Sequence, residues 1–228
     1  VFVLFTRARF DLDGALLLSS IYYLSVVVFE VPSGWASDRL GRVPTLRAAA
    51  VAWVGAQTCF LAGGDRLGAV AAGQALLAFG FACLSGTDVT FHYDTLEALG
   101  RAGDYGHRQA TVASIGFLTT AASALVGGAL GLVDVRLAFA VALVLALVQL
   151  GVAAALREPP PGPEEPVPGS DGLAPGPAPE PRHWLRELGD LAAYRRDRAV
   201  AWLFFYGILL VTLEHVAFVL LQPWLTAV

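Results

Sequence analysis

The chain has 228 residues, of which 56% are hydrophobic and only 15% are charged, and its mean hydropathy is +0.63. A soluble domain usually carries about a quarter charged residues, whereas the charges here fall in short clusters between apolar runs long enough to span a bilayer. This pattern excludes a soluble globular domain and predicts an all-α integral membrane protein, surrounded by lipid and without a nucleic-acid partner. Cys59 and Cys83 lie inside apolar segments and are expected to be packing residues, not a disulfide.

In chain order, an apolar stub at 1–5 is followed by six segments with the length and hydrophobicity of membrane spans. We interpret the stub as the end of a truncated helix, because the chain contains no methionine and residue 1 is not expected to be the natural start. The third span is the longest and carries polar residues in its second half. The expected spans are 15–37, 44–62, 68–99, 108–130, 136–156 and 199–221.

A proline-rich stretch separates the last span from the others. Ten of the thirteen prolines fall between Pro159 and Pro181, a composition that cannot cross a bilayer or pack a core. Behind it, residues 183–196 place apolar side chains on one helical face, which is typical of a helix lying on the membrane surface. The predicted organisation is a membrane bundle at 1–156, a linker with a surface helix at 157–196, and the start of a second bundle at 197–228.

The arginines predict the orientation of the spans. Because successive loops alternate between the two sides of the membrane, eleven of the fifteen arginines fall on the side of the proline-rich linker. Arginine-rich loops stay in the cytoplasm. We therefore expect a multi-pass protein of the cell (inner) membrane whose linker is cytoplasmic.

Ionisable residues inside three of the spans are the candidate functional groups. Charged side chains in hydrocarbon cost about 2.5–3.5 kcal/mol each, so they normally face a partner or a water-filled cavity. Asp88 and His92 are four residues apart on one helix face, where they can form a carboxylate–imidazole pair that binds a proton. A buried pair that only pins the helix to a neighbour is the alternative. Glu30 and Glu214 are the further candidates for substrate or proton coupling.

Two acidic residues of the long span have a different expected role. Asp94 and Glu97 lie closer to its cytoplasmic end than Asp88 does. We expect them to be interfacial or paired with Arg101, which follows in the next turn.

The turn between the first two complete spans carries the pattern G-x-x-x-D-R-x-G-R. Gly34 is expected to let a neighbouring helix approach closely, and Gly41 to permit a tight turn between the two helices. Asp38, Arg39 and Arg42 place opposite charges at the cytoplasmic end, where they can pair with another helix end in only one conformation. These five residues form the predicted conformational latch.

This pattern resembles the signature loop of the major facilitator superfamily, which lies between helices 2 and 3 of that fold. The resemblance covers nearly the whole chain and implies an N-terminal six-helix bundle with a truncated helix 1, a cytoplasmic linker and helix 7. Residues 29–34, 85–88 and 93–96 resemble a bacterial subgroup of drug or small-solute transporters. The antiporter pattern G-P-x-x-G-G is incomplete at 123–128, although small residues at 116, 120, 124 and 128 are suited to close helix packing.

The resemblance implies secondary active transport of a small solute by alternating access, with proton-coupled efflux as one form of it. It implies no cofactor, no metal and no enzymatic activity, and a monomer when the protein is full length. Two alternatives stay open: a non-transporting membrane scaffold or sensor, and a membrane-embedded enzyme that uses Asp88, His92 and Asp94. The enzyme is less favoured, because Asp94 is rotated away from the face shared by Asp88 and His92, and no H-E-x-x-H pattern is present.

Overall fold

The protein is described here by a computed structural model that covers residues 10–160, 198, 201–202, 205–207 and 209–210. Over these ranges the chain forms helices and turns and contains no strand, and five of its helices are long and apolar enough to cross a membrane. The predicted all-α membrane class is confirmed. The elements are α2 (Leu12–Leu40), α3 (Arg42–Gly63), α4 (Leu67–Leu84), α5 (Thr87–Ala98), the short 3-10 helix η1 (Ala102–Asp104), α6 (Tyr105–Val133) and α7 (Val135–Ala155).

The chain divides into two compact units, Val1–Pro166 and Val167–Val228, and each is described by itself. In the second unit, the described residues of the expected span 199–221 are helical, and the rings of Trp202 and Phe205 stack with their centroids 5.5 Å apart. The stub at 1–5, the surface helix at 183–196 and Glu214 lie outside the described residues.

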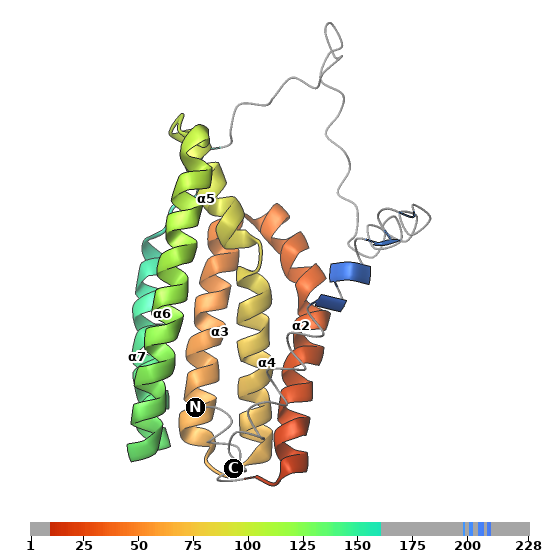
Figure 1. Cartoon of the computed structure of the whole chain (residues 1–228), viewed down its shortest axis with the longest axis vertical. Coiled ribbons are helices and arrows are strands. Elements are labelled where there is room, and N and C mark those ends of the chain that lie inside the picture. Colours follow the sequence, from red (N-terminus) through yellow and green to blue (C-terminus); the bar gives the residue numbers. More distant parts are fainter. Residues whose placement is uncertain (1–9, 161–197, 199–200, 203–204, 208, 211–228) are drawn as a thin grey trace, which may run out of the picture. The chain divides into compact units, whose positions relative to one another are not determined.

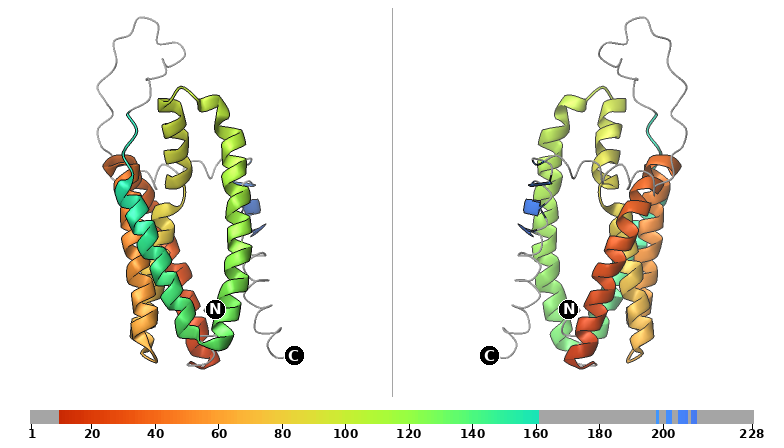
Figure 2. Two further views of the ribbon diagram at one scale, coloured as in Figure 1. Left: turned by 90° about the vertical axis from the view of Figure 1, so that its left-hand side faces the viewer. Right: turned by 90° about the vertical axis from the view of Figure 1, so that its right-hand side faces the viewer.

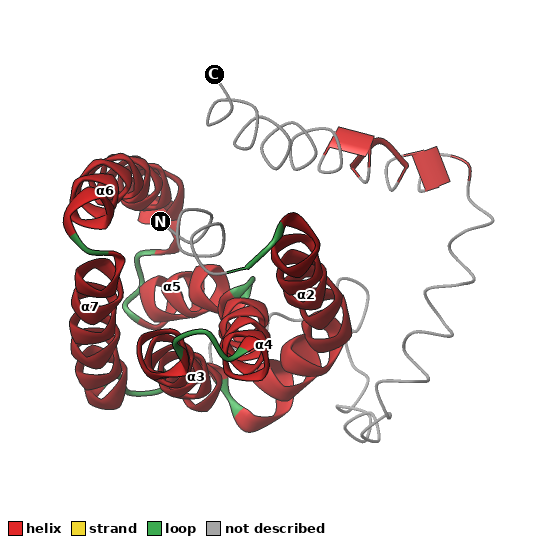
Figure 3. Ribbon diagram, turned by 90° about the horizontal axis from the view of Figure 1, so that it is seen from below, coloured by secondary structure: helices red, strands yellow, loops and turns green. Residues whose placement is uncertain are grey.

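In the first unit, α3 packs against α4 on one side and α7 on the other, and α2 packs against α4 (Figures 1 and 3). Their apolar faces meet in a core formed by Leu18, Ala56, Phe60, Val70 and Phe139, one or two residues from each of these four helices. Between helices in lipid, such side chains stabilise the bundle through van der Waals packing. We call the end of this bundle that carries the α2–α3 turn, α5 and the end of α7 the loop end; it is uppermost in Figure 1.

Two glycines bring α3 and α4 close together. A Cβ atom at Gly80 would lie 2.3 Å from the ring of Trp53, and one at Gly73 would lie 2.6 Å from the ring of Phe60. Trp53 also donates its indole N–H to the carbonyl oxygen of Leu77 at 3.2 Å. The close packing of these two helices therefore depends on the absence of side chains at Gly73 and Gly80.

The prediction of one continuous helix at 68–99 is wrong, because α4 ends at Leu84 and α5 begins at Thr87. Gly86 lies between them with φ of +75°, a conformation that favours glycine and interrupts a right-handed helix. The break frees the carbonyl oxygen of Ala82, which accepts a hydrogen bond from Ser33 Oγ on α2 at 2.9 Å. The Ala82 carbonyl therefore keeps a hydrogen-bond partner despite the interruption, because a neighbouring helix supplies the donor.

The small-residue stripe of α6 does not pack closely against any described helix. Among the described residues, no atom lies within 4 Å of a Cβ built at Gly116 or Gly128, and no residue of α6 is buried. The helix leans away from α2, α3 and α4, and meets α7 at one end and α5 at the other (Figure 2). Close packing in the described part of the chain occurs instead at the α4 glycines, a pattern that the sequence analysis did not single out.

Candidate functional site

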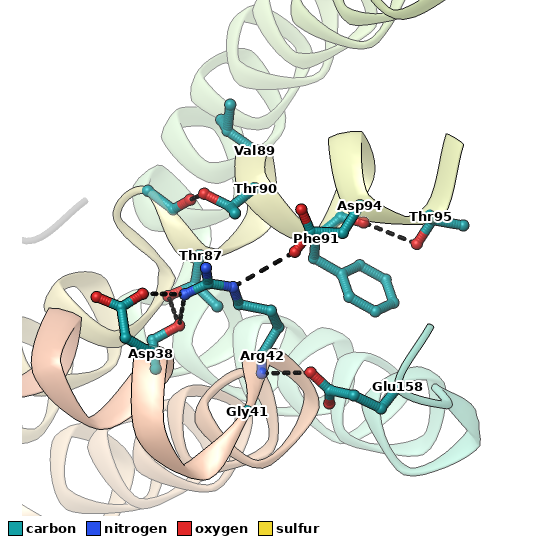
Figure 4. A network of polar contacts seen from close by, with 12 residues as sticks. Asp38, Gly41, Arg42, Thr87, Val89, Thr90, Phe91, Asp94, Thr95 and Glu158 are labelled. Carbon is teal, nitrogen blue, oxygen red and sulfur yellow. Dashed lines mark hydrogen bonds and ion pairs between the residues drawn. The ribbon is translucent and has the colours of Figure 1, made fainter. Parts of the chain in front are cut away.

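Arg42, the first residue of α3, connects three helices at the loop end. Its Nη1 donates to Asp38 Oδ1 in the last turn of α2, and its Nε lies 3.6 Å from Asp94 Oδ2 on α5. Figure 4 shows the guanidinium between these two carboxylates. Arg42 therefore connects the α2–α3 turn, which is the predicted latch, to Asp94 within α5.

Two buried hydroxyl groups strengthen this connection. Ser37 Oγ accepts from Arg42 Nη1 and from Thr87 Oγ1, each at 3.1 Å. Ser37 and Thr87 are both only 3% exposed, so their hydrogen bonds are shielded from solvent. Gly41 has φ of +101°, which confirms that the tight turn requires a glycine. The α2–α3 turn is thus fixed to the start of α5 as well as to Asp94.

Of the two roles expected for Asp94, interfacial or paired with Arg101, the pair with Arg101 is not formed in the structure. Arg101 donates to Asp104 Oδ2 at 2.9 Å through Nε and at 2.6 Å through Nη2. Asp104 is three residues away in η1, so it can reach Arg101 within a single turn of chain. Asp94 is left to meet Arg42, which is far from it in the sequence but adjacent in the fold.

The other two latch residues are placed differently. The guanidinium of Arg39 lies 4.8 Å from the ring centroid of Trp35, one turn earlier on α2. At Gly34, no atom of the described residues lies within 4 Å of the position of a Cβ. The expected close approach of a helix at Gly34 is therefore not made by any described residue.

Glu30 lies beside the break between α4 and α5. Its Oε1 accepts a hydrogen bond from Ser85 Oγ at 2.8 Å, and Ser85 immediately precedes Gly86. Three residues along α2 from Glu30, Ser33 donates to Ala82 of α4. Glu30 and Ser33 are thus polar groups of α2 that contact the interrupted part of the α4–α5 span.

Asp88 and His92 share α5 but have separate partners in this structure. Asp88 is exposed, and its Oδ1 accepts from the backbone N–H of Val89 at 2.8 Å. His92 Nδ1 lies 2.8 Å from Gln109 Oε1 on α6, and its ring contacts that of Tyr105 at a centroid distance of 5.6 Å. The histidine therefore links α5 to α6, and the proposed carboxylate–imidazole pair is not formed here.

The sequence analysis missed two residues that join the latch to α7. Glu158, which lay in the predicted linker, accepts hydrogen bonds from the backbone N–H groups of Arg42 and Val43. Arg47 on α3 donates to carbonyl oxygens at the end of α7. In the sequence, Arg47 lies about one turn into a predicted span and Glu158 lies just before the prolines. Neither position predicts which residue it contacts.

The described ranges hold no group of three or more His, Cys, Asp or Glu side chains that could bind a metal ion. Both cysteines are free thiols, as expected. The side chains at the loop end are instead arranged as ion pairs and hydrogen bonds between helices. Such an arrangement can hold or release a conformation.

Comparison with known protein families gives one match, to the Major Facilitator Superfamily over residues 6–228. The chain belongs to the Major Facilitator Superfamily. No curated protein and no solved structure matches it. This superfamily consists of membrane transporters, and the five apolar helices of the described residues are consistent with its helical bundle.

The family match spans the α2–α3 turn, α5 and the segment after α7, which are the three parts of the chain that meet around Arg42.

Proposed function

We propose that this superfamily member carries a small solute across the cell (inner) membrane by alternating access, with the loop end in the cytoplasm. The solute is of the kind carried by the bacterial drug and small-solute subgroup that the sequence resembles, and proton-coupled efflux is the form of transport. Two bundles would rock around a site near the middle of the membrane. The network around Arg42 would hold one of the two states.

The observation that carries this proposal is the pairing of Arg42 with Asp94 and Asp38. The side chains are partly open to solvent: Arg42 is 23% exposed, Asp94 33% and Asp38 69%. Ion pairs with this exposure stabilise a structure by about 0–1 kcal/mol each. Such pairs are strong enough to favour one arrangement and weak enough to break during a transport cycle.

The interrupted α4–α5 span supports a role for acidic residues in the same cycle. Transporters place substrate and ion sites at helices that are broken inside the membrane. Glu30 bonds to Ser85 at this break, and Asp88 lies in the first turn of α5, where the helix dipole favours a carboxylate. We propose that Glu30 and Asp88 bind solute or a proton, assisted by His92 and by Glu214 of the next bundle.

Flux through proteoliposomes tests this function. Candidate solutes are first selected by their ability to raise the melting temperature of the purified protein, and then applied to vesicles that contain a pH-sensitive dye. We expect solute-dependent proton movement that is absent from protein-free vesicles. Solutes that bind but do not move, in either direction and at any pH gradient, would favour the scaffold or sensor instead. Turnover of the solute into a product would favour the enzyme.

A further inference from the structure

The start of α3 is capped by a residue that follows α7 and is distant from it in the sequence. Glu158 Oε1 accepts from the backbone N–H of Arg42 at 2.7 Å, and its Oε2 accepts from that of Val43 at 2.8 Å. Gly41, the residue before the helix, has no side chain with which to cap it. A carboxylate satisfies the free N–H groups of a first helical turn and also interacts favourably with the positive end of the helix dipole.

The same carboxylate lies against the turn itself. A Cβ atom at Gly41 would be 3.1 Å from Glu158 Oε1 and 3.2 Å from Oε2, so the glycine leaves room for it. Arg42 is thereby held at two points: its backbone N–H by Glu158, and its guanidinium by Asp38 and Asp94 (Figure 4). The direction of the Arg42 side chain depends on its backbone, which Glu158 fixes.

A reciprocal contact keeps Glu158 in place. Arg47, one turn further along α3, donates to the carbonyl oxygens of Ala153, Ala154 and Leu156 at 3.1, 3.0 and 2.9 Å. These carbonyls belong to the last turn of α7 and the residue after it, where a helix runs out of backbone donors, and Ala153 O also accepts from the backbone N–H of Leu156. The end of α7 is thus capped by α3, and the start of α3 is capped by the residue that follows α7.

We propose that Glu158 is a positioning residue of the transporter, which orients Arg42 toward Asp94 and so ties the chain that follows α7 to the latch. This inference rests on the latch role given to Arg42 in the proposed function. The Arg42–Asp94 pair then forms and breaks together with the hydrogen bonds from the start of α3 to Glu158. Movement of the segment after α7 releases the pair.

Nitrogen-15 labelling of arginine tests this proposal in the intact purified protein. The Nε–H signal of Arg42 is assigned by its loss in Arg42→Lys. The chemical shift of this signal in Asp94→Asn defines its position when Arg42 is not paired with Asp94. In Glu158→Gln, we expect the signal to move toward that unpaired position. Amide hydrogen exchange at 41–46 should accelerate about fivefold, as expected for the loss of a helix cap. Arg157→Gln is the matched control, since Arg157 is exposed and adjacent, and it should change neither measurement.

Three outcomes separate the possibilities. Faster exchange at 41–46 in Glu158→Gln with an unmoved Arg42 signal would make Glu158 a helix cap alone and overturn the proposal. An Arg42 signal that does not respond to Asp94→Asn would remove the latch, and the positioning role with it. A full Arg42 response in a protein that moves no solute would support the positioning role while contradicting transport. Equal melting temperatures of Glu158→Gln and Arg157→Gln exclude general unfolding as the cause.

Discussion

At the scale of single residues, three of the buried polar side chains in the described ranges, Ser33, Ser37 and Thr87, join one helix to another. Ser33 is only 5% exposed, and its hydroxyl group donates a hydrogen bond to Ala82 O at the point where α4 ends. At the start of α5, Ser37 Oγ accepts from Thr87 Oγ1, a hydrogen bond between two side chains that joins α2 to α5. A backbone carbonyl that loses its donor inside a membrane has no water to replace it. The Ser33 side chain therefore makes the break in the α4–α5 span possible.

The Ser33 bond leads to a prediction about stability. Ser33→Ala leaves the Ala82 carbonyl without its donor, and we expect a loss of about 1–2 kcal/mol in the free energy of unfolding, measured by SDS titration in mixed micelles. Ser20→Ala is the control, because Ser20 is exposed and donates only to Leu16 O of its own helix. Equal stability of the two variants would mean that the break needs no donor from α2.

The carboxylate of Asp88 leads to a prediction about pH. If Asp88 carries the coupled proton, Asp88→Asn removes the titrating group, and the solute flux should lose most of its dependence on pH. Glu97→Gln, on the same helix, is the matched control and should keep the wild-type profile. The measurement is the initial flux rate in proteoliposomes across a series of pH values. A profile that Asp88→Asn leaves unaltered would contradict the role of Asp88 in binding the coupled proton.

At the scale of the elements, hydrophobicity was sufficient to locate the helices but not their irregularities. All five tested spans are present because an uninterrupted run of about twenty apolar residues has few alternatives to a helix. The break at Gly86 was missed because a single glycine in an apolar helix is common and does not by itself end it. The interruption becomes stable through Ser33 and Glu30, which come from another helix.

The predicted partners of charged residues differ from those in the structure. Arg101 was expected as a partner of Asp94 and Glu97, but it pairs with Asp104 in the following turn. Asp94 and Glu158 both reach the start of α3 from distant parts of the chain. Contacts between such distant parts of the chain depend on how the helices pack, and no local sequence pattern predicts them.

The contact between α3 and α4 gives a prediction at this scale. In Gly80→Ala, the new methyl group would meet the Trp53 ring at 2.3 Å, so the helices must separate, and we expect a loss of about 1–3 kcal/mol. Gly68→Ala is a matched control on the same helix, with no atom within 4 Å among the described residues. It should be neutral or stabilising by up to about 1 kcal/mol. Thermal unfolding in one detergent compares the two, and a neutral Gly80→Ala would contradict the close packing.

At the scale of the whole molecule, the loop end connects parts of the chain that a transport cycle must coordinate. Arg42 joins α2, α3 and α5, while Glu158 and Arg47 add the end of α7. Each contact is modest, and together they determine one arrangement of this end of the bundle. Under the proposed function, the α2–α3 turn would control the cycle, and Glu30 and Asp88 would bind solute or a proton.

Transport by Asp38→Asn tests this account most directly. The substitution removes the charge that pairs with Arg42 in the latch while keeping the size of the side chain. Asp104→Asn breaks an ion pair of similar exposure at the same end, outside the latch. We predict that Asp38→Asn inserts normally and transports about fivefold more slowly, the equivalent of about 1 kcal/mol, while Asp104→Asn transports at the wild-type rate. Equal rates for Asp38→Asn and the wild type would contradict the latch.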